Sequence, residues 1–409
     1  MDSPLPQIVL FNAATSLGGT AVLALRMAGE LKRLGAPFLV IDQHGGFLSE
    51  ELRKLQLPCV SPASSGKRRK LDHLLPANAV IIAYCHDLLP ISTVLDGKAA
   101  RLLLWDVYPP LWLDGFLNVN LPVLRRLLNR PGWFAQARKD VVSKMMNSGG
   151  VVFTDEIGLK NVELLTGRKW PEAGIVPVPV EMLSSPQRLR PRTGGAVSCV
   201  YIGRASPWKV VPARRLLEDF GSHANVHWTI LTESATRFKA MLGAGLTGSI
   251  DYVEGVYGAA LDPWLLSHAD ICFGMGTSCL EGAKLGVPSI LMDFVASKDE
   301  MPGRYGYRWL YQEAGYGLGR DVSGCPGVPG MTAGQVLAEV QQEAGRVGRL
   351  CWETVREKFA LRSVAEKLLL AARHTRLGLT DCTSNNLFRL GRLGQRWRQF
   401  RTRRELSSA

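Results

Sequence analysis

Short apolar segments alternate with longer stretches of helical periodicity along this chain. The first apolar segment, residues 7–12, is followed by the turn at Gly18 and Gly19. After it, apolar side chains recur at the helical spacing of three or four residues and end at Gly35. Residues 38–41 are apolar again and predict a second strand. This order of strand, turn, helix and strand predicts a parallel sheet that is covered by helices on its faces.

The same alternation continues through the chain and restarts in its second half. Further strands are expected at 79–84, 101–107, 151–154, 198–202, 225–231 and 249–253. Asp155 is expected to cap the helix that runs to Leu165. Residues 184–195, which are rich in Pro, Arg, Ser and Gly, are the expected linker. We therefore predict two Rossmann-like, doubly wound α/β domains at 1–185 and 196–370 that face a cleft, and a basic tail at 371–409.

The clearest chemical pattern is a strand, a glycine turn and a short helix within residues 270–291. Gly276 ends the strand region, and Thr277 and Ser278 stand where the helix should begin. Amide groups at such a helix start have no partner within the helix and favour an anion such as phosphate. Glu281, one turn further on, is placed to hold the hydroxyls of a nucleotide ribose. The alternative is a capping box, in which Ser278 and Glu281 only satisfy the amides of the helix.

Two further strand ends carry charged groups. Arg204 and Lys209 follow the strand at 198–202, and two fixed cations there could stabilise a departing diphosphate without a metal. The alternative is an exposed basic loop. His86 follows the strand at 79–84, at the carboxyl end where α/β sheets bind ligands. His86 would contact a sugar or an acceptor, or it would cap the next helix or pair with Asp87.

These motifs resemble the signature of retaining GT-B glycosyltransferases of family 4. In that family a small-residue turn precedes a Leu-Glu-Ala helix and a Gly-x-Pro strand entry, as at 276–288 here. The resemblance implies the GT-B fold, a nucleotide-sugar donor and a ribose contact by Glu281. Gly203-Arg204 and Lys209 look like the diphosphate-holding Gly-Arg…Lys-Gly segment, although Val210 replaces the last glycine. The chain also departs from the family signature at one position. Phe273 stands where the family usually has a glutamate that contacts the donor sugar.

The resemblance extends to the first half of the chain. Gly18 and Gly19 are similar in position to the N-terminal Gly-Gly loop that approaches the donor diphosphate in GT-B enzymes. A histidine after a strand, like His86, often contacts the donor hexose there. The last helices of such folds cross back to the first domain, which suits residues from about 352 onward.

Composition narrows the set of partners. The formal net charge is +13, which suits nucleic acid, an anionic membrane or an anionic substrate. The basic residues form no recognised nucleic-acid module, so no nucleic-acid partner is expected. Aromatic and basic residues mix at 108–139 and 387–404, which suits an anionic membrane surface. The alternatives are a core helix with a solvated basic face and a disordered tail.

Several sequence patterns that are absent from this chain bear on where the protein is located and on whether it binds a metal. The start of the chain lacks the features of a signal peptide, and no apolar run is long enough to span a bilayer. We expect a cytoplasmic protein, peripheral on the inner face of the cytoplasmic membrane. The eight cysteines form no Cys-x-x-Cys pair, and no Asp-x-Asp motif occurs. Neither a metal nor a cofactor is therefore expected besides the nucleotide-diphosphate sugar itself.

Together these patterns predict a hexosyltransferase. It would move a sugar from a nucleotide-sugar donor, with retention, to a glycan or lipid-linked acceptor of the kind found in cell-surface polysaccharide or lipopolysaccharide. Two alternatives remain open at this point. One is a nucleotide-sugar epimerase of the same fold, and the other is a non-catalytic GT-B relic that binds a glycan or a protein.

Overall fold

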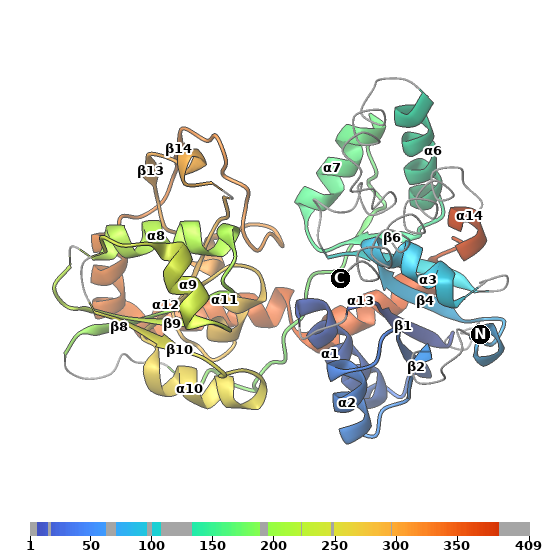
Figure 1. Cartoon of the computed structure of the whole chain (residues 1–409), viewed down its shortest axis with the longest axis horizontal. Coiled ribbons are helices and arrows are strands. Elements are labelled where there is room, and N and C mark those ends of the chain that lie inside the picture. Colours follow the sequence, from blue (N-terminus) through green and yellow to red (C-terminus); the bar gives the residue numbers. More distant parts are fainter. Residues whose placement is uncertain are drawn as a thin grey trace, which may run out of the picture. The chain divides into compact units, whose positions relative to one another are not determined.

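The computed structural model describes residues 6–14, 18–62, 71–95, 100–107, 133–188, 195–221, 223–246, 249–295 and 297–383. The chain divides into two compact units (Figure 1). Unit 1 consists of Met1–Val178 and Leu361–Ala409, and unit 2 consists of Pro179–Ala360. Each unit contains its own parallel sheet and its own hydrophobic core.

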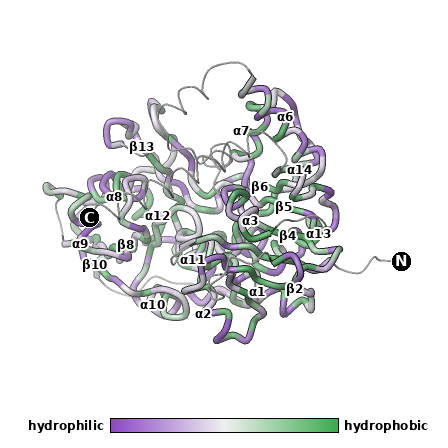
Figure 2. The backbone as a smooth tube through the Cα atoms, turned by 45° about the vertical axis from the view of Figure 1, so that its right-hand side comes forward, coloured by the Kyte–Doolittle hydropathy of each residue, from purple (hydrophilic) through white to green (hydrophobic). Residues whose placement is uncertain are grey.

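Unit 1 is built on a seven-stranded parallel sheet with the order β3-β2-β1-β4-β5-β6-β7. Its strands are β1 Ile8–Asn12, β2 Phe38–Asp42, β3 Cys59–Val60, β4 Val80–Tyr84, β5 Arg101–Asp106, β6 Val151–Phe153 and β7 Gly174–Ile175. The central strands are almost wholly apolar, as the green course of β4 and β5 in Figure 2 shows. Such continuous apolar runs are typical of strands that are buried on both faces.

Helices cover both faces of this sheet. They are α1 Gly19–Arg33, α2 Phe47–Lys54, α3 Leu88–Val94, α6 Trp133–Asn147, α7 Glu156–Thr166, α13 Leu361–His374 and α14 Leu379–Thr383, with single 3₁₀ turns at Asp72–Leu74 and Cys85–Asp87. Val80 and Ile82 of β4 pack in one core with α1, α2 and α13, whereas Ile81 and Ala83 pack in another with α3, α6 and α7. The alternation of side chains along each strand therefore builds two cores from one sheet.

Unit 2 repeats this architecture with a five-stranded parallel sheet of order β10-β9-β8-β11-β12. Its strands are β8 Val197–Ile202, β9 Val226–Leu231, β10 Ile250–Val253, β11 Ile271–Gly274 and β12 Ser289–Leu291, with a separate parallel pair of β13 Arg304–Tyr305 and β14 Gly327–Val328. Its helices are α8 Pro207–Phe220, α9 Ala235–Leu242, α10 Leu261–His268, α11 Thr277–Ala283 and α12 Ala333–Lys358, with 3₁₀ turns at Gly258–Ala260, Lys298–Glu300 and Leu310–Gln312.

The two strand orders confirm the predicted fold class of two Rossmann-like, doubly wound domains. The strands expected from the sequence are present with ends shifted by a residue or two. Asp155 caps α7 as expected, because its carboxylate accepts a hydrogen bond from the amide of Gly158 at 2.9 Å.

The unit boundaries differ from the predicted ranges of 1–185, 196–370 and 371–409. The first boundary lies between Val178 and Pro179 rather than in the expected linker at 184–195. Arg188, inside that expected linker, is buried and pairs with Asp270 of unit 2. The second boundary lies at 360, since α13 packs on the sheet of unit 1. Spatially, the last part of the chain therefore belongs to the first unit.

Most of the two stretches that suggested a membrane surface lie outside the described residues. Of 108–139 the structure describes only 133–139, which begin α6, and all of 387–404 is outside. In the part of the chain that is described, no helix is both long and apolar enough to cross a bilayer.

Candidate functional site

Each sheet has one point at which the direction of winding reverses. In unit 1 this point lies between β1 and β4, and in unit 2 it lies between β8 and β11. Loops that leave two such strands diverge, so the carboxyl ends at this point form the usual ligand crevice of open α/β sheets. In unit 1, Gly18 and Gly19 follow β1 and His86 follows β4. In unit 2, Arg204 and Lys209 follow β8, and the turn at 276–278 follows β11.

The loop after β8 presents two cations to this edge of unit 2. Arg204 is exposed, and Lys209 lies in the first turn of α8. The ammonium group of Lys209 donates a hydrogen bond of 2.9 Å to the carbonyl of Met275, in the turn that follows β11. This bond links the β8 loop directly to the β11 turn. The structure thus brings together the two halves of the predicted diphosphate site.

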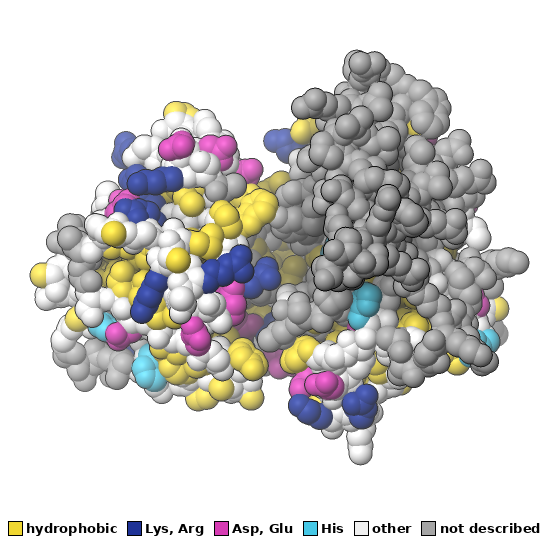
Figure 3. All heavy atoms as spheres, viewed as in Figure 1, with side chains coloured by type: hydrophobic (Ala, Val, Ile, Leu, Met, Phe, Trp, Pro, Cys, Tyr) yellow, Lys and Arg dark blue, Asp and Glu magenta, His cyan; other side chains and the backbone are white. Residues whose placement is uncertain are grey.

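The charge of Lys209 is marginal in this environment. Burial of its ammonium group lowers the pKa to about 7, and repulsion by Arg204 acts in the same direction. An ammonium group in such surroundings gains most from a neighbouring anion, since neutralisation by the anion offsets both effects. On the face of unit 2 that Figure 3 shows, Lys and Arg side chains lie among hydrophobic ones in the region of α8 and α9.

The β11 turn needs glycine at its centre. Gly276 has a φ of +65° and precedes the first helical residue of α11. Its own amide donates to the carbonyl of Leu318 at 2.8 Å, so this amide is occupied in the structure. Thr277 and Ser278 are the first two residues of α11, and their amides have no partner within the helix. Of the three predicted phosphate donors in this turn, the amide of Gly276 is therefore engaged by the protein itself, which leaves the amides of Thr277 and Ser278 for the prediction.

Glu281 does not form the capping box that was the alternative. The residue before α11 is Gly276 rather than Ser278, and glycine has no side chain with which to cap the helix. The buried carboxylate of Glu281 instead pairs with Lys284 at 2.7 Å, and Lys284 also pairs with Asp262 at 2.8 Å. Burial opposes the charge of Lys284, but these two carboxylates outweigh it and raise the pKa of the lysine. The position of Glu281 is thus fixed by an ion pair.

Phe273 is part of the core of unit 2. Its side chain is fully buried, and its ring makes an edge contact with Phe220 at a centroid distance of 5.4 Å. Trp228 packs on it at 5.2 Å. A glutamate at this position would place a carboxylate among these rings, which is costly without a partner. Phe273, which stands in place of the family's glutamate, is therefore a packing residue of the core around β11.

In unit 1 the predicted glycines begin a helix. Gly18 precedes α1 with an extended backbone, Gly19 is the first helical residue, and Gly18 has no side chain with which to cap the helix. Tyr84, at the end of β4, donates a hydrogen bond of 2.8 Å to the carbonyl of Thr20 and so ties this helix start to the neighbouring strand. The amides of the first turn are thereby held at the carboxyl edge of the sheet.

His86 lies at the same edge in a half-buried position. Its Nε2 atom is 3.6 Å from Oδ1 of Asp87, which is longer than a hydrogen bond, and its ring stacks on Tyr84. Burial lowers the pKa of His86. Burial also raises the pKa of Asp87 to about 7, although the amide of Ala13 opposes this shift. His86 therefore does not cap α3, whereas it lies within ion-pair distance of Asp87, as one of the alternatives expected.

Two residues that hold the β8 loop were missed by the sequence analysis. Glu233, just after β9, accepts hydrogen bonds from the amide of Ala205 with both carboxylate oxygens, at 3.0 and 3.1 Å. Tyr201 of β8 lies beneath the loop and donates to the carbonyl of Lys209 at 2.7 Å. The signal for Glu233 was its place directly after a predicted strand, where polar residues of neighbouring loops meet.

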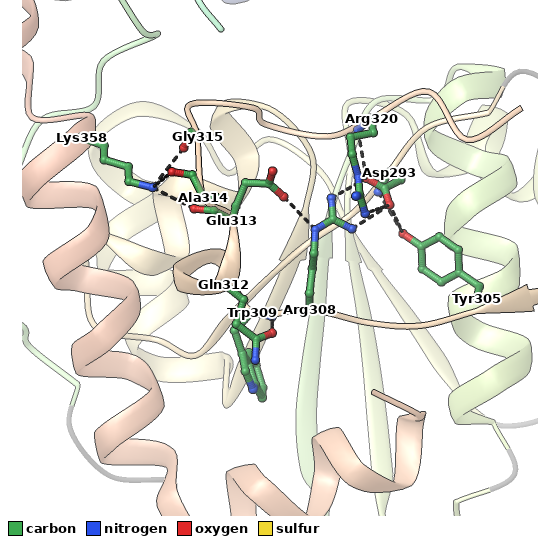
Figure 4. Close-up of polar contacts among 10 residues, drawn as sticks. All are labelled: Asp293, Tyr305, Arg308, Trp309, Gln312, Glu313, Ala314, Gly315, Arg320 and Lys358. Carbon is green, nitrogen blue, oxygen red and sulfur yellow. Dashed lines mark hydrogen bonds and ion pairs between the residues drawn. The ribbon is translucent and has the colours of Figure 1, made fainter. Parts of the chain in front are cut away.

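The carboxyl end of β12 carries a buried ion network (Figure 4). Asp293 accepts two hydrogen bonds from Arg308, at 2.8 and 2.6 Å, and one from the amide of Arg320 at 2.9 Å. Burial would raise the pKa of Asp293, but the two arginines outweigh burial and lower it. Arg308 also pairs with Glu313 at 2.9 Å. Arg308 thus holds Asp293 and Glu313 together within unit 2.

This network also supports the β11 turn. Lys358 of α12 donates to the carbonyls of residues 313–315, as Figure 4 shows, and Arg320 is bound to Asp293. Leu318, between these anchors, accepts the hydrogen bond from Gly276. The segment after Arg308 therefore holds the backbone of the predicted phosphate turn in place.

Among the residues that the structure covers, no group of three His, Cys, Asp or Glu side chains is arranged to hold a metal ion. All eight cysteines are free thiols.

The fold resembles solved glycosyltransferases. A glycosyltransferase from Rickettsia africae superposes with a TM-score of 0.56 and 14% sequence identity over 90% of this chain and 98% of that one. HepE from Anabaena, solved with UDP and glucose, gives 0.54 and 12% over 90% and 99%. A variant of TarM from S. aureus, solved with UDP, α-GlcNAc-glycerol and fondaparinux, gives 0.55 and 10% over 90% and 100%.

These similarities establish the GT-B fold for this chain, as the sequence resemblance implied. No protein-family model matches the sequence, and no curated protein sequence does.

Proposed function

We propose that this protein is a glycosyltransferase that transfers a sugar from a nucleotide-diphosphate donor to a glycan or lipid-linked acceptor, with retention. The observation that carries the proposal is the junction of the β8 loop with the β11 turn. There the ammonium group of Lys209 bonds to the carbonyl of Met275 just before the start of α11, and Arg204 is close enough to lower the pKa of Lys209, so we assign the diphosphate to this junction. The proposal is supported by structures of the same fold that were solved with UDP.

Each group has a role in this proposal. Breaking the bond between sugar and phosphate leaves negative charge on the diphosphate, which Arg204 and Lys209 would stabilise. The amides of Thr277 and Ser278 would donate to the phosphate oxygens, and Glu281 would accept from the ribose hydroxyls.

From unit 1, the amides at Gly18 and Gly19 would complete the phosphate site, and His86 would contact the sugar. The acceptor hydroxyl would attack from the face that the diphosphate leaves, so no protein nucleophile takes part.

A panel of nucleotide sugars tests the proposal most directly. The nucleotide and sugar that belong to this site should raise the melting temperature of the full chain by mass action. The same donor should then be turned over with release of the nucleoside diphosphate, and we expect turnover to continue in EDTA because the two cations can meet the diphosphate charge. Release of an altered free sugar without any acceptor would identify an epimerase instead. Binding without turnover would identify a non-catalytic protein.

Glu281→Gln should weaken nucleotide binding by about 10–100-fold, since hydrogen bonds to a charged acceptor contribute about 1.5–3 kcal/mol. The change also removes one carboxylate from Lys284 and should lower the melting temperature. Asp262→Asn is the matched control, because it removes the other partner of Lys284. Titration calorimetry with the nucleotide separates the two effects. If both variants melt lower and bind the nucleotide as the parent does, Glu281 only neutralises Lys284.

We further propose reversible attachment to the inner face of an anionic membrane through 108–139 and 387–404. Such attachment would bring the enzyme to a lipid-linked acceptor. The second stretch carries seven arginines together with Trp397 and Phe400. Near an anionic leaflet each basic residue contributes about 1 kcal/mol, and added salt screens this attraction.

Co-sedimentation with vesicles tests this attachment. The full chain should sediment with anionic vesicles at low salt and stay in solution at high salt, and deletion of 387–404 should reduce binding. Neutral vesicles are the control. Equal recovery in the supernatant with anionic and neutral vesicles at low salt would refute the attachment.

A further inference from the structure

Unit 2 contains a cavity with a volume of about 460 Å³. Sites for small molecules usually have volumes of about 300–1,000 Å³. The cavity lies between the second half of α8, the β13–β14 pair and the start of α12, and Figure 1 shows this pair of strands next to α8. Its lining includes Arg215, Asp219, His223, Arg304, Met331 and Gly334.

This cavity is separate from the proposed diphosphate site, although α8 contributes to both. Lys209 lies in the first turn of α8, whereas the lining begins at Arg215, about 9 Å further along the helix axis. The structure describes Arg204, Lys209 and the turn at 276–278, and none of them lines the cavity. A ligand in the cavity would therefore occupy a second site of unit 2.

The carboxylate of Asp219 is engaged by the protein itself. It accepts a hydrogen bond of 2.9 Å from Nε of Arg215 and one of 2.8 Å from the hydroxyl of Tyr307. Both terminal nitrogens of Arg215 also lie 3.3 Å from the carbonyl oxygen of Gly303, to which they donate. The pair of Arg215 and Asp219 is therefore neutral as a whole and is fixed to the wall of the cavity, so it repels an anion only weakly.

Two further basic side chains at the cavity have no partner among the residues that the structure describes. Arg304 of β13 is exposed, and no acceptor in the described part of the chain reaches its guanidinium group. The ring of His223 is half-buried and likewise makes no hydrogen bond there. It lies against the start of α12, since a Cβ atom on Gly334 would be 3.5 Å from Cε1 of His223.

The start of α12 adds hydrogen-bond donors beside this ring. Thr332 caps the 26-residue helix, and its hydroxyl accepts from the amide of Gln335 at 3.3 Å. The amides of Ala333 and Gly334 precede Gln335 and have no acceptor within the helix. A helix start also carries partial positive charge, which adds to that of the neighbouring arginines.

We propose that this cavity binds a small soluble phosphomonoester. Asp219 is the one carboxylate among the described lining residues, and Arg215 neutralises it, so Arg304 leaves the lining with a positive charge. The guanidinium groups, the imidazole and the two amides offer more donors than a carboxylate ligand can accept, whereas a phosphate group brings three acceptor oxygens and nearly two charges. An arginine fork also matches two phosphate oxygens.

The ligand should carry an organic part as well. A phosphate group would fill only part of the volume, and Met331 and the backbone of Gly306 and Gly330 line the remainder without adding a charge. This inference does not depend on the proposed function, because no residue of the diphosphate site takes part in it.

Arg304→Gln is the main test, since it removes the unpaired charge from an exposed position. His223→Gln is a second test at the opposite wall, should Arg304→Gln fold poorly. Arg349→Gln makes the same change on the exposed face of α12, in the later half of that helix, and is the matched control. Arg204→Ala reports on the other site, because it should weaken any phosphate that binds at the diphosphate position.

The probes are inorganic phosphate and glycerol 3-phosphate, with glycerol as the neutral counterpart, titrated into the full chain at constant ionic strength and followed by calorimetry. Both phosphates should bind, glycerol 3-phosphate more tightly, and glycerol should not bind. Arg304→Gln should weaken the binding of glycerol 3-phosphate about tenfold, and His223→Gln should weaken it as well. Arg349→Gln and Arg204→Ala should leave the affinity unchanged.

Four results would overturn the inference. The first is binding of neither phosphate, and the second is binding of glycerol as tightly as glycerol 3-phosphate. The third is an equal loss of affinity in Arg349→Gln and Arg304→Gln, which would mean that the net charge of the protein attracts the phosphate without a site. The fourth is a loss in Arg204→Ala with none in Arg304→Gln or His223→Gln, which would place the phosphate at the diphosphate site instead.

Discussion

Replacing Arg204 or Lys209 with alanine should lower the turnover of the nucleotide sugar by about 10²–10³-fold, with a smaller change in donor affinity. Negative charge on the diphosphate increases as the bond to the sugar breaks, so a fixed cation stabilises the transition state more than the bound donor. The hydrogen bond from Lys209 to the carbonyl of Met275 holds one of these cations at the β11 turn before the donor arrives. Such preorganisation is what makes an electrostatic contribution large.

Steady-state kinetics with the donor found in the panel measure this effect. Arg237→Ala, on the exposed side of α9, is the control for loss of one positive charge from unit 2. The melting temperature of each variant separates a folding defect from a catalytic one, which matters for Lys209 because its side chain supports the turn. Full turnover in both the Arg204 and the Lys209 variant would remove the diphosphate assignment.

Nucleotide-sugar affinity should fall as the pH rises above 7, by no more in total than the affinity lost in Lys209→Ala, and Lys209→Arg should abolish this dependence. The pKa of Lys209 in the empty protein is lowered to about 7 by burial, so the lysine is mostly charged below pH 7 and mostly neutral above it. A bound diphosphate favours the charged form and raises this pKa. Above pH 7, binding of the nucleotide sugar is therefore accompanied by uptake of one proton by Lys209. The affinity decreases with rising pH until the pH reaches the pKa that Lys209 has in the complex.

Titration calorimetry between pH 6 and 9 in buffers of different ionisation heat measures both the affinity and the proton uptake. A nucleotide sugar is preferable to the free nucleotide, because a terminal phosphate itself titrates near pH 6. Arginine stays charged over this range, so Lys209→Arg should bind with nearly constant affinity. An equal decline in the parent and in Lys209→Arg would assign the titration to another group.

Much of the fold could be predicted from local pattern alone. Strands such as β4 and β5 are continuous apolar runs that end at polar or glycine residues. This pattern can be recognised in the sequence without knowledge of the tertiary structure. Alternation of such strands with helical periodicity permits few topologies, because parallel connections are right-handed and short. The unit boundary at 360 could not be found this way, since α13 has an apolar face that would suit either sheet.

The sequence by itself determined that Arg204, Lys209, the 276–278 turn and His86 follow strands at the carboxyl edges of two parallel sheets, because strand direction follows from chain order. Tertiary structure alone decided which of their atoms are engaged. Glu281 pairs with Lys284, the amide of Gly276 is bound by Leu318, and Phe273 is enclosed by aromatic rings. Burial and pairing depend on groups that are distant in the chain, and no local pattern records which distant groups will meet.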